Sequence, residues 1–99
     1  MYMNVFRSRK HPDHDAAAYA ADAARMDELA RAQSGFLDYK SFAAPDGETV
    51  TISVWESTAA AKAWARHPEH LAAQARGRQD YYAQFTVYAC DETRVRRFP

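Results

Sequence analysis

The sequence predicts an α+β fold, a ferredoxin-like βαββαβ sandwich with one four-stranded antiparallel sheet. Alternating segments and helically spaced segments follow in the order strand, helix, strand, strand, helix, strand, which is the split βαβ pattern. The length of 99 residues and the 47% hydrophobic content favour one folded domain over residues 1–99. A chain of this size buries roughly two thirds of its unfolded surface and cannot divide into two cores.

The first strand is predicted over residues 1–9, where apolar and polar residues alternate with a period of two. Either Asp13 or Asp15 can cap the helix that follows. One apolar stripe at helical spacing marks this helix: Ala16, Tyr19, Ala23, Met26 and Ala30. Gly35 supplies the left-handed residue that is expected to end it.

The clearest hairpin signal is Pro45-Asp46-Gly47, a tight turn between strands predicted over 37–44 and 48–55. In the second arm Val50, Ile52 and Val54 share one face, and Trp55 must lie on the other.

The second helical region is predicted as two pieces with a kink. Ser57 caps the piece over 58–66, Pro68 disfavours helical geometry at His67 and starts the next piece, and Gly77 is expected to end it. The last strand is predicted over 81–90, and residues 95–98 are expected to extend it or to cover a sheet edge.

Right-handed crossovers place both helices on one face of the sheet, so the other face has no partner within the monomer. The strands present aromatic and aliphatic side chains to both faces, which would leave a large apolar surface in water. The sequence therefore predicts a homodimer.

Charge excludes several classes of partner. Thirteen basic residues balance thirteen acidic ones, so no positive field attracts nucleic acid or anionic lipid, and no apolar run is long enough to span a membrane. The single cysteine, Cys90, cannot form an internal disulfide and is expected to stay reduced, in agreement with a cytoplasmic location.

Several separated motifs carry a resemblance to a known family: residues 6–9, 35–37, 52–57, 63–70 and 73–78, read as FRSR, GFL, ISVWES, AWARHPEH and AQARGR. With them the chain resembles the antibiotic biosynthesis monooxygenase family. The resemblance implies a dimeric α+β barrel in which two sheets pack face to face, with a cavity between sheet and helices in each subunit. Members include cofactor-free monooxygenases of phenolic polyketides, haem-degrading enzymes, quinol-related enzymes and proteins without an assigned activity.

Trp64 is the first candidate site residue. In an alanine-rich helix, an indole most commonly fills the core, and the functional interpretation is a cavity wall that stacks on a flat aromatic substrate. The haem-degrading members that the chain resembles also place a tryptophan there.

His67 and His70 lie three residues apart, either side of Pro68. Two histidines without a placed carboxylate or thiolate make an incomplete metal site, so no metal is expected. The preferred interpretation makes His70 the acid or base that acts on a phenolic substrate near neutral pH.

The remaining candidates complete a cavity lining. Tyr82, Asn4 and Ser53 are expected to bind substrate together with Trp64 and His67. Tyr81 and Tyr82 are expected to point to opposite faces of the last strand. The histidine that ligates iron in the haem-degrading branch would fall near Gln74, and glutamine is a poor haem ligand.

We therefore expect a cofactor-independent monooxygenase, with no cofactor, that acts on a small aromatic or quinone-like compound. The first alternative is a non-catalytic dimer that binds a small apolar ligand or serves a stress role, and haem degradation ranks below both. A reachable cavity with convergent polar groups would favour the enzyme, whereas a filled interior would favour the structural dimer.

Overall fold

The computed structural model describes the whole chain, residues 1–99, and confirms the predicted βαββαβ order. The elements are β1 (Tyr2–Lys10), α1 (Ala16–Arg31), β2 (Phe36–Ala43), β3 (Thr49–Trp55), α2 (Thr58–Ala65), α3 (Pro68–Arg76), the π-helical turn η1 (Gly77–Tyr81) and β4 (Tyr82–Cys90).

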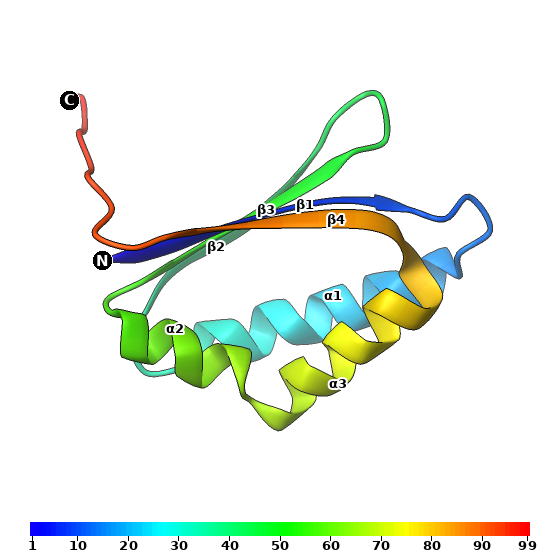
Figure 1. Cartoon of the computed structure of the whole chain (residues 1–99), viewed down its shortest axis with the longest axis horizontal. Helices are drawn as coiled ribbons and strands as arrows, with labels where there is room; N and C mark the ends of the chain where they lie inside the picture. Colours follow the sequence, from blue (N-terminus) through cyan, green and yellow to red (C-terminus); the bar gives the residue numbers. More distant parts are fainter.

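The four strands form one antiparallel sheet in the order β2-β3-β1-β4. Figure 1 shows all the helices on one face of this sheet, with the opposite face bare. The tip of the β2–β3 hairpin and the C-terminal residues 91–99 both rise on the bare side (Figure 1). None of the helices has the length and apolar character needed to cross a membrane.

Strand register decides which side chains face the helices. Trp55 is fully buried in the core with α2, so Ser53 on the same strand also points toward the helices. The alternate positions Val50, Ile52 and Val54 therefore lie on the bare face, opposite Trp55 as predicted.

The ends of α1 resolve one alternative and correct one expectation. Asp15 is the cap, because its carboxylate accepts a hydrogen bond from the Ala18 backbone N–H at 2.9 Å. The helix ends at Arg31 rather than at Gly35. Gly35 is left-handed (φ 81°), but in the turn into β2, where an added Cβ would lie 2.5 Å from the Ala60 Cβ.

The junction of α3 and β4 also differs from the expectation. α3 ends at Arg76 with Gly77 as its C-cap, as predicted, but the chain continues directly into the π-helical turn η1 and the strand starts at Tyr82 instead of Tyr81. Gly77 has an ordinary helical φ of −58° and also serves close packing. An added Cβ would lie 2.5 Å from the Tyr82 ring. Residues 95–98 form no strand and do not extend β4.

The buried hydrophobic core is small and lies at one end of the space between the sheet and the helices. It joins Met26 and Ala30 of α1, Trp55 of β3, and Ala61 and Trp64 of α2. Only nine of the 99 residues are buried, because much of the space between sheet and helices is a cavity.

Candidate functional site

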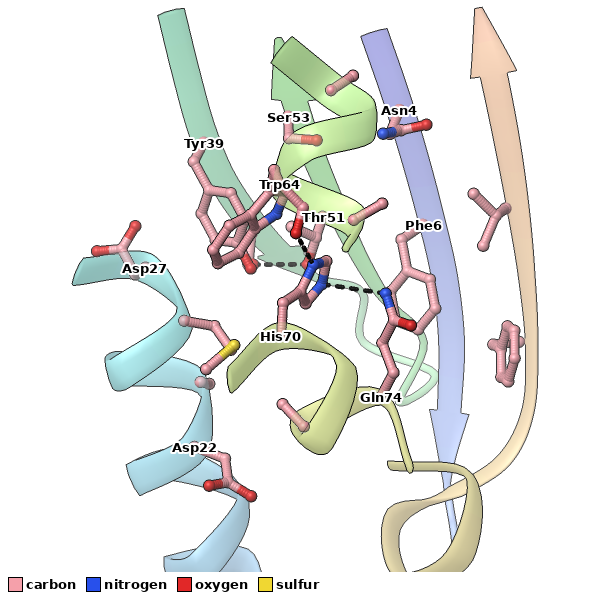
Figure 2. A pocket seen from close by; sticks show the side chains of 18 of the residues that line it. Asn4, Phe6, Asp22, Asp27, Tyr39, Thr51, Ser53, Trp64, His70 and Gln74 are labelled. Carbon is pink, nitrogen blue, oxygen red and sulfur yellow. Dashed lines mark hydrogen bonds between the residues drawn. The ribbon is translucent and has the colours of Figure 1, made fainter. Parts of the chain in front are cut away.

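A cavity of about 730 Å³ lies between the helix-facing side of the sheet and α1, α2, α3 and η1. Fifteen of its 27 lining residues are hydrophobic or aromatic, and the other twelve are polar or charged (Figure 2). Small-molecule sites in proteins commonly have about 300–1,000 Å³ and this mixture of side chains. The cavity therefore has the size and the character of a site for a small aromatic molecule.

Trp64 belongs both to the core and to the cavity wall. Its side chain is 3% exposed, and its ring stacks on Trp55 with 6.1 Å between ring centroids. The His70 ring lies on Trp64 at 4.2 Å and only 14° from parallel. The indole thus supports His70 from one side and closes one end of the cavity.

His70 is held by two hydrogen-bonding contacts (Figure 2). Its Nδ1 lies 2.9 Å from the Trp64 carbonyl oxygen, and its Nε2 lies 3.4 Å from the Gln74 side-chain nitrogen. A carbonyl oxygen only accepts, so Nδ1 carries the proton and donates. In the neutral ring, Nε2 is then left with its lone pair and accepts the long hydrogen bond from Gln74.

The electrostatics of His70 favour that neutral form. Burial lowers the pKa of His70 below its ordinary 6.5, against the opposite effect of the bond to the Trp64 carbonyl, and His67 lowers it further. At neutral pH the side chain is therefore an uncharged imidazole that can take up a proton at Nε2.

His67 does not line the cavity. Its Nδ1 accepts a hydrogen bond from the Glu69 backbone N–H at 3.2 Å, so the side chain caps the start of α3. Glu69 itself is paired with Arg25 of α1 at 2.9 Å. The two histidines on either side of Pro68 therefore have separate positions, one at a helix cap and one in the cavity wall.

Asn4, Ser53 and Tyr82 do line the cavity. Asn4 of β1 and Ser53 of β3 are direct partners in the antiparallel register, so their side chains lie next to each other on the helix-facing side. Ser53 is buried, with 7% exposure. Together they give the sheet side of the cavity an amide and a hydroxyl.

Two further tyrosines of the lining, Tyr19 and Tyr39, were missed by the sequence analysis. Burial raises the pKa of Tyr39 to about 12, and burial together with the neighbouring Tyr19 raises the pKa of Tyr82 far above its ordinary 10. Both phenols therefore stay protonated and act as hydrogen-bond donors. The alternation along β2 places Tyr39 and Ser41 on the same face of the strand. The sequence does not show whether this face lies toward the helices, because that depends on the register with β3.

Tyr81 also lines the cavity, which corrects the expectation that Tyr81 and Tyr82 point to opposite faces. The reason is that Tyr81 belongs to η1 and not to the strand, so strand alternation does not apply to it. Its hydroxyl donates to the Asp22 carboxylate at 2.8 Å, next to Arg76. The bond from Arg76 holds the pKa of Asp22 below its ordinary range.

The wall does not reproduce the haem site of the haem-degrading branch. Gln74 lies in the cavity wall at the place where the resemblance puts the iron-binding histidine, and an amide is a poor haem ligand. Gln74 therefore does not fit axial ligation of a haem at that place.

Comparison with known proteins gives matches over most of the chain. Residues 1–76 match the family described as "Antibiotic biosynthesis monooxygenase". The uncharacterized protein YqjZ of Bacillus subtilis (strain 168) is 36% identical over 97 residues, which cover 98% of this chain and 83% of YqjZ.

Solved structures show the same fold at low identity. Rv0793 of Mycobacterium tuberculosis superposes with a TM-score of 0.83 at 21% identity, covering 95% of this chain and 96% of its own. SnoaB of Streptomyces nogalater, described as a cofactor-independent oxygenase, has a TM-score of 0.72 at 20% identity, with 93% and 94% covered.

Proposed function

Because the chain belongs to the antibiotic biosynthesis monooxygenase family, we propose that it is a cofactor-independent monooxygenase acting on a small aromatic phenol, anthrone or quinol. One observation carries the proposal: a neutral histidine, His70, presents Nε2 in the wall of an aromatic cavity. The description of the structural neighbour SnoaB as a cofactor-independent oxygenase is consistent with it.

The role of His70 is proton abstraction. Oxygen chemistry without a cofactor needs a substrate that itself gives an electron to O₂, which a phenolate or enolate does and a phenol does not. Nε2 of His70 accepts the substrate proton, and the Trp64 carbonyl stabilises the imidazolium because Nδ1 donates to it at 2.9 Å. The long 3.4 Å contact to Gln74 is weak enough for a substrate hydroxyl to replace it.

The oxidation is balanced by O₂ and the substrate alone. For an anthrone, the first C–H proton goes to His70, the carbanion transfers one electron to O₂, and the two radicals combine into a peroxide anion that takes up the proton. Loss of the second C–H proton and cleavage of the O–O bond give a carbonyl and water. The substrate CH₂ is thereby oxidised and one O₂ is reduced, with one oxygen atom in each product.

Protonated phenols supply the complementary electrostatics. Tyr39 and Tyr82 remain O–H donors at neutral pH, and the Asn4 amide adds a further donor on the sheet side. Donors of this kind stabilise the negative charge that develops on the substrate oxygen after deprotonation. The cavity thus combines one base with several neutral donors.

A purely structural dimer predicts an interior filled with side chains, so a cavity of about 730 Å³ lined by His70, Asn4 and Ser53 disfavours it. A non-catalytic dimer that binds a small ligand also has a cavity, and only turnover separates it from the enzyme.

Oxygen uptake tests the proposal. The protein is incubated with anthrones and with quinols, and consumption of O₂ is recorded together with formation of the quinone product. We expect turnover without added metal, flavin or haem. Binding of these compounds with no oxygen uptake above the rate in buffer would instead support the binding module.

A further inference from the structure

The side chain of Gln74 contacts the proposed base. His70 and Gln74 lie four residues apart on α3, so both side chains are on one face of the helix, and both line the cavity. The side-chain nitrogen of Gln74 lies 3.4 Å from Nε2 of His70 (Figure 2). Among the neutral donors of the lining, Gln74 is therefore the one that is hydrogen-bonded to the base.

Most of the hydrogen-bonding capacity of Gln74 is unused. A side-chain amide has two N–H donors and a carbonyl acceptor. The contact with His70 takes up one N–H, and the side chain of Gln74 makes no other hydrogen bond within the chain. The residue is only half-buried. The amide can therefore turn toward a ligand without breaking a second contact.

The geometry allows one substrate oxygen to contact both side chains. An oxygen that gives its proton to His70 must approach Nε2 from the side on which Gln74 lies. If it is about 2.8 Å from both nitrogens and the two hydrogen bonds meet at a tetrahedral angle, the nitrogens are about 4.6 Å apart. They lie 3.4 Å apart in the structure. A small rotation about the side-chain bonds of Gln74 therefore makes room for the oxygen and keeps the amide beside it.

The kind of proton that His70 removes decides whether Gln74 can help. When the proton leaves an O–H group, negative charge develops on the oxygen beside the amide, and an N–H group binds a charged acceptor more strongly than a neutral one. Such a donor stabilises the deprotonated state more than the bound substrate. When the proton leaves a C–H group, as in an anthrone, the charge moves to a carbonyl oxygen across the ring, and the amide faces carbon.

We propose that Gln74 is a catalytic residue whose amide N–H binds the substrate oxygen from which His70 removes the proton, and that the site is matched to phenols and hydroquinones rather than to C–H acids. The inference rests on the proposed function for the identity of the base. In this step the substrate O–H bond breaks, an N–H bond forms at Nε2, and the electron pair stays on the oxygen, where the Gln74 amide binds it.

The ionisation of a bound phenol tests this role without turnover. 4-Nitrophenol is the probe, because its phenolate absorbs visible light and O₂ does not oxidise it. Its absorbance is titrated with pH in the presence of saturating protein. Gln74→Met keeps the length of the side chain and removes its N–H donors. In this variant the ionisation constant of the bound phenol should fall about tenfold or more, since a hydrogen bond to a charged group is worth at least about one pKa unit.

Gln79→Met is the matched control, because Gln79 is exposed in η1 and does not line the cavity. This variant should keep the ionisation constant that the natural chain gives. Far-UV circular dichroism checks that both variants are folded. An unchanged ionisation constant in folded Gln74→Met would show that the amide does not contact the phenol oxygen, and the inference would be wrong.

Oxygen uptake tests the substrate class. The two substrates are anthrone, which loses a C–H proton, and 1,5-dihydroxynaphthalene, an O–H acid that one O₂ converts to a hydroxynaphthoquinone and water. Gln74→Met should lower kcat/KM about tenfold for the naphthalene diol and leave it unchanged for anthrone. Equal losses for both substrates would show that Gln74 acts only through His70, which would overturn its contact with the substrate oxygen.

The results also separate this inference from the proposed function. If no substrate gives oxygen uptake but the ionisation constant of 4-nitrophenol falls in Gln74→Met, the oxygenase is wrong and the phenol site with Gln74 stands. If 4-nitrophenol does not bind while anthrone is oxidised, the role of Gln74 is wrong and the proposed function stands.

Discussion

At the scale of single residues, the chemistry depends on which nitrogen of His70 holds the proton. The Trp64 carbonyl lies on the Nδ1 side and can only accept, so the basic nitrogen is the one that faces Gln74. His67, three residues earlier, uses its own Nδ1 to cap α3. Two histidines close in sequence thus differ in role because of one backbone carbonyl and one backbone N–H.

His70→Gln should lower the rate of O₂ uptake with an oxidisable anthrone by about 10²- to 10⁴-fold, the usual contribution of a general base. The melting temperature should change little, because an amide at this position can still donate to the Trp64 carbonyl. His67→Asn is the control and should keep the rate, since asparagine is also a good helix cap. A full-rate His70→Gln protein would remove His70 from the mechanism.

The lowered pKa of His70 also predicts a pH dependence of stability. Above pH 6.5 the side chain is neutral in both folded and unfolded chains, so its contribution is fully present. Below pH 6.5 the unfolded chain takes up the proton first, so stability falls as the pH falls toward the folded pKa. Thermal unfolding between pH 8 and 5.5 should show a larger loss for the natural chain than for His70→Gln. Parallel curves for the two proteins would contradict the buried neutral imidazole.

At the scale of elements, the segment from α3 through η1 to β4 builds one end of the cavity. After α3 ends at Arg76, the chain continues through the wider turn η1, in which the Tyr81 hydroxyl bonds to Asp22, and β4 starts with Tyr82. Tyr82 then packs against Phe6 of β1 with 5.3 Å between ring centroids. The absence of a side chain at Gly77 makes this arrangement possible.

Gly77→Ala should therefore destabilise the fold. The new methyl group would lie 2.5 Å from the Tyr82 ring, which cannot move without disturbing Phe6. Overpacking of this kind costs about 1–3 kcal/mol, against a gain of about 1 kcal/mol in helix propensity. Chemical denaturation measures the free energy of unfolding. In a Tyr82→Ala background the same substitution should be neutral or stabilising, and an equal cost in both backgrounds would show that the Tyr82 ring is not the cause.

At the scale of the whole molecule, the small core and the bare sheet face both leave apolar side chains of the monomer unburied. Two layers that enclose a cavity bury little, and the aliphatic side chains of β3 lie on the face without helices. Val5 of β1 is next to Ile52 of β3 and Tyr88 of β4 in the register, so the apolar surface continues across three strands. A second copy of the chain, packed face to face, is the partner we expect.

Light scattering should show a homodimer at micromolar concentration, with an interface of about 2,000 Å² or more in total. Ile52→Lys places a charge at the centre of the bare face and should give monomers. Ala24→Lys adds the same charge on the exposed surface of α1 and should leave the dimer intact. A natural chain that is monomeric at this concentration would show that the bare face is stable in water.

Much of the fold follows from local patterns in the sequence. The element order, the turn at Pro45-Asp46-Gly47, the kink at Pro68 and the capping of α2 by Ser57 depend on residues close together in the chain, where periodicity and backbone preference act. Trp64 and His70 can be recognised as candidate site residues from the sequence, because an indole and an imidazole are unusual in an alanine-rich segment.

The tertiary structure alone decided what faces the cavity. A strand with a period of two has two equivalent faces, and only the pairing with its neighbours and the position of the helices shows that Ser53 and Tyr39 are inside and Ile52 is outside. The pairing of Asp22 with Arg76, next to the Tyr81 hydroxyl, joins residues 54 positions apart in the chain. The sequence by itself determined the elements, because these depend on neighbours along the chain, whereas the site depends on contacts between elements that the fold brings together.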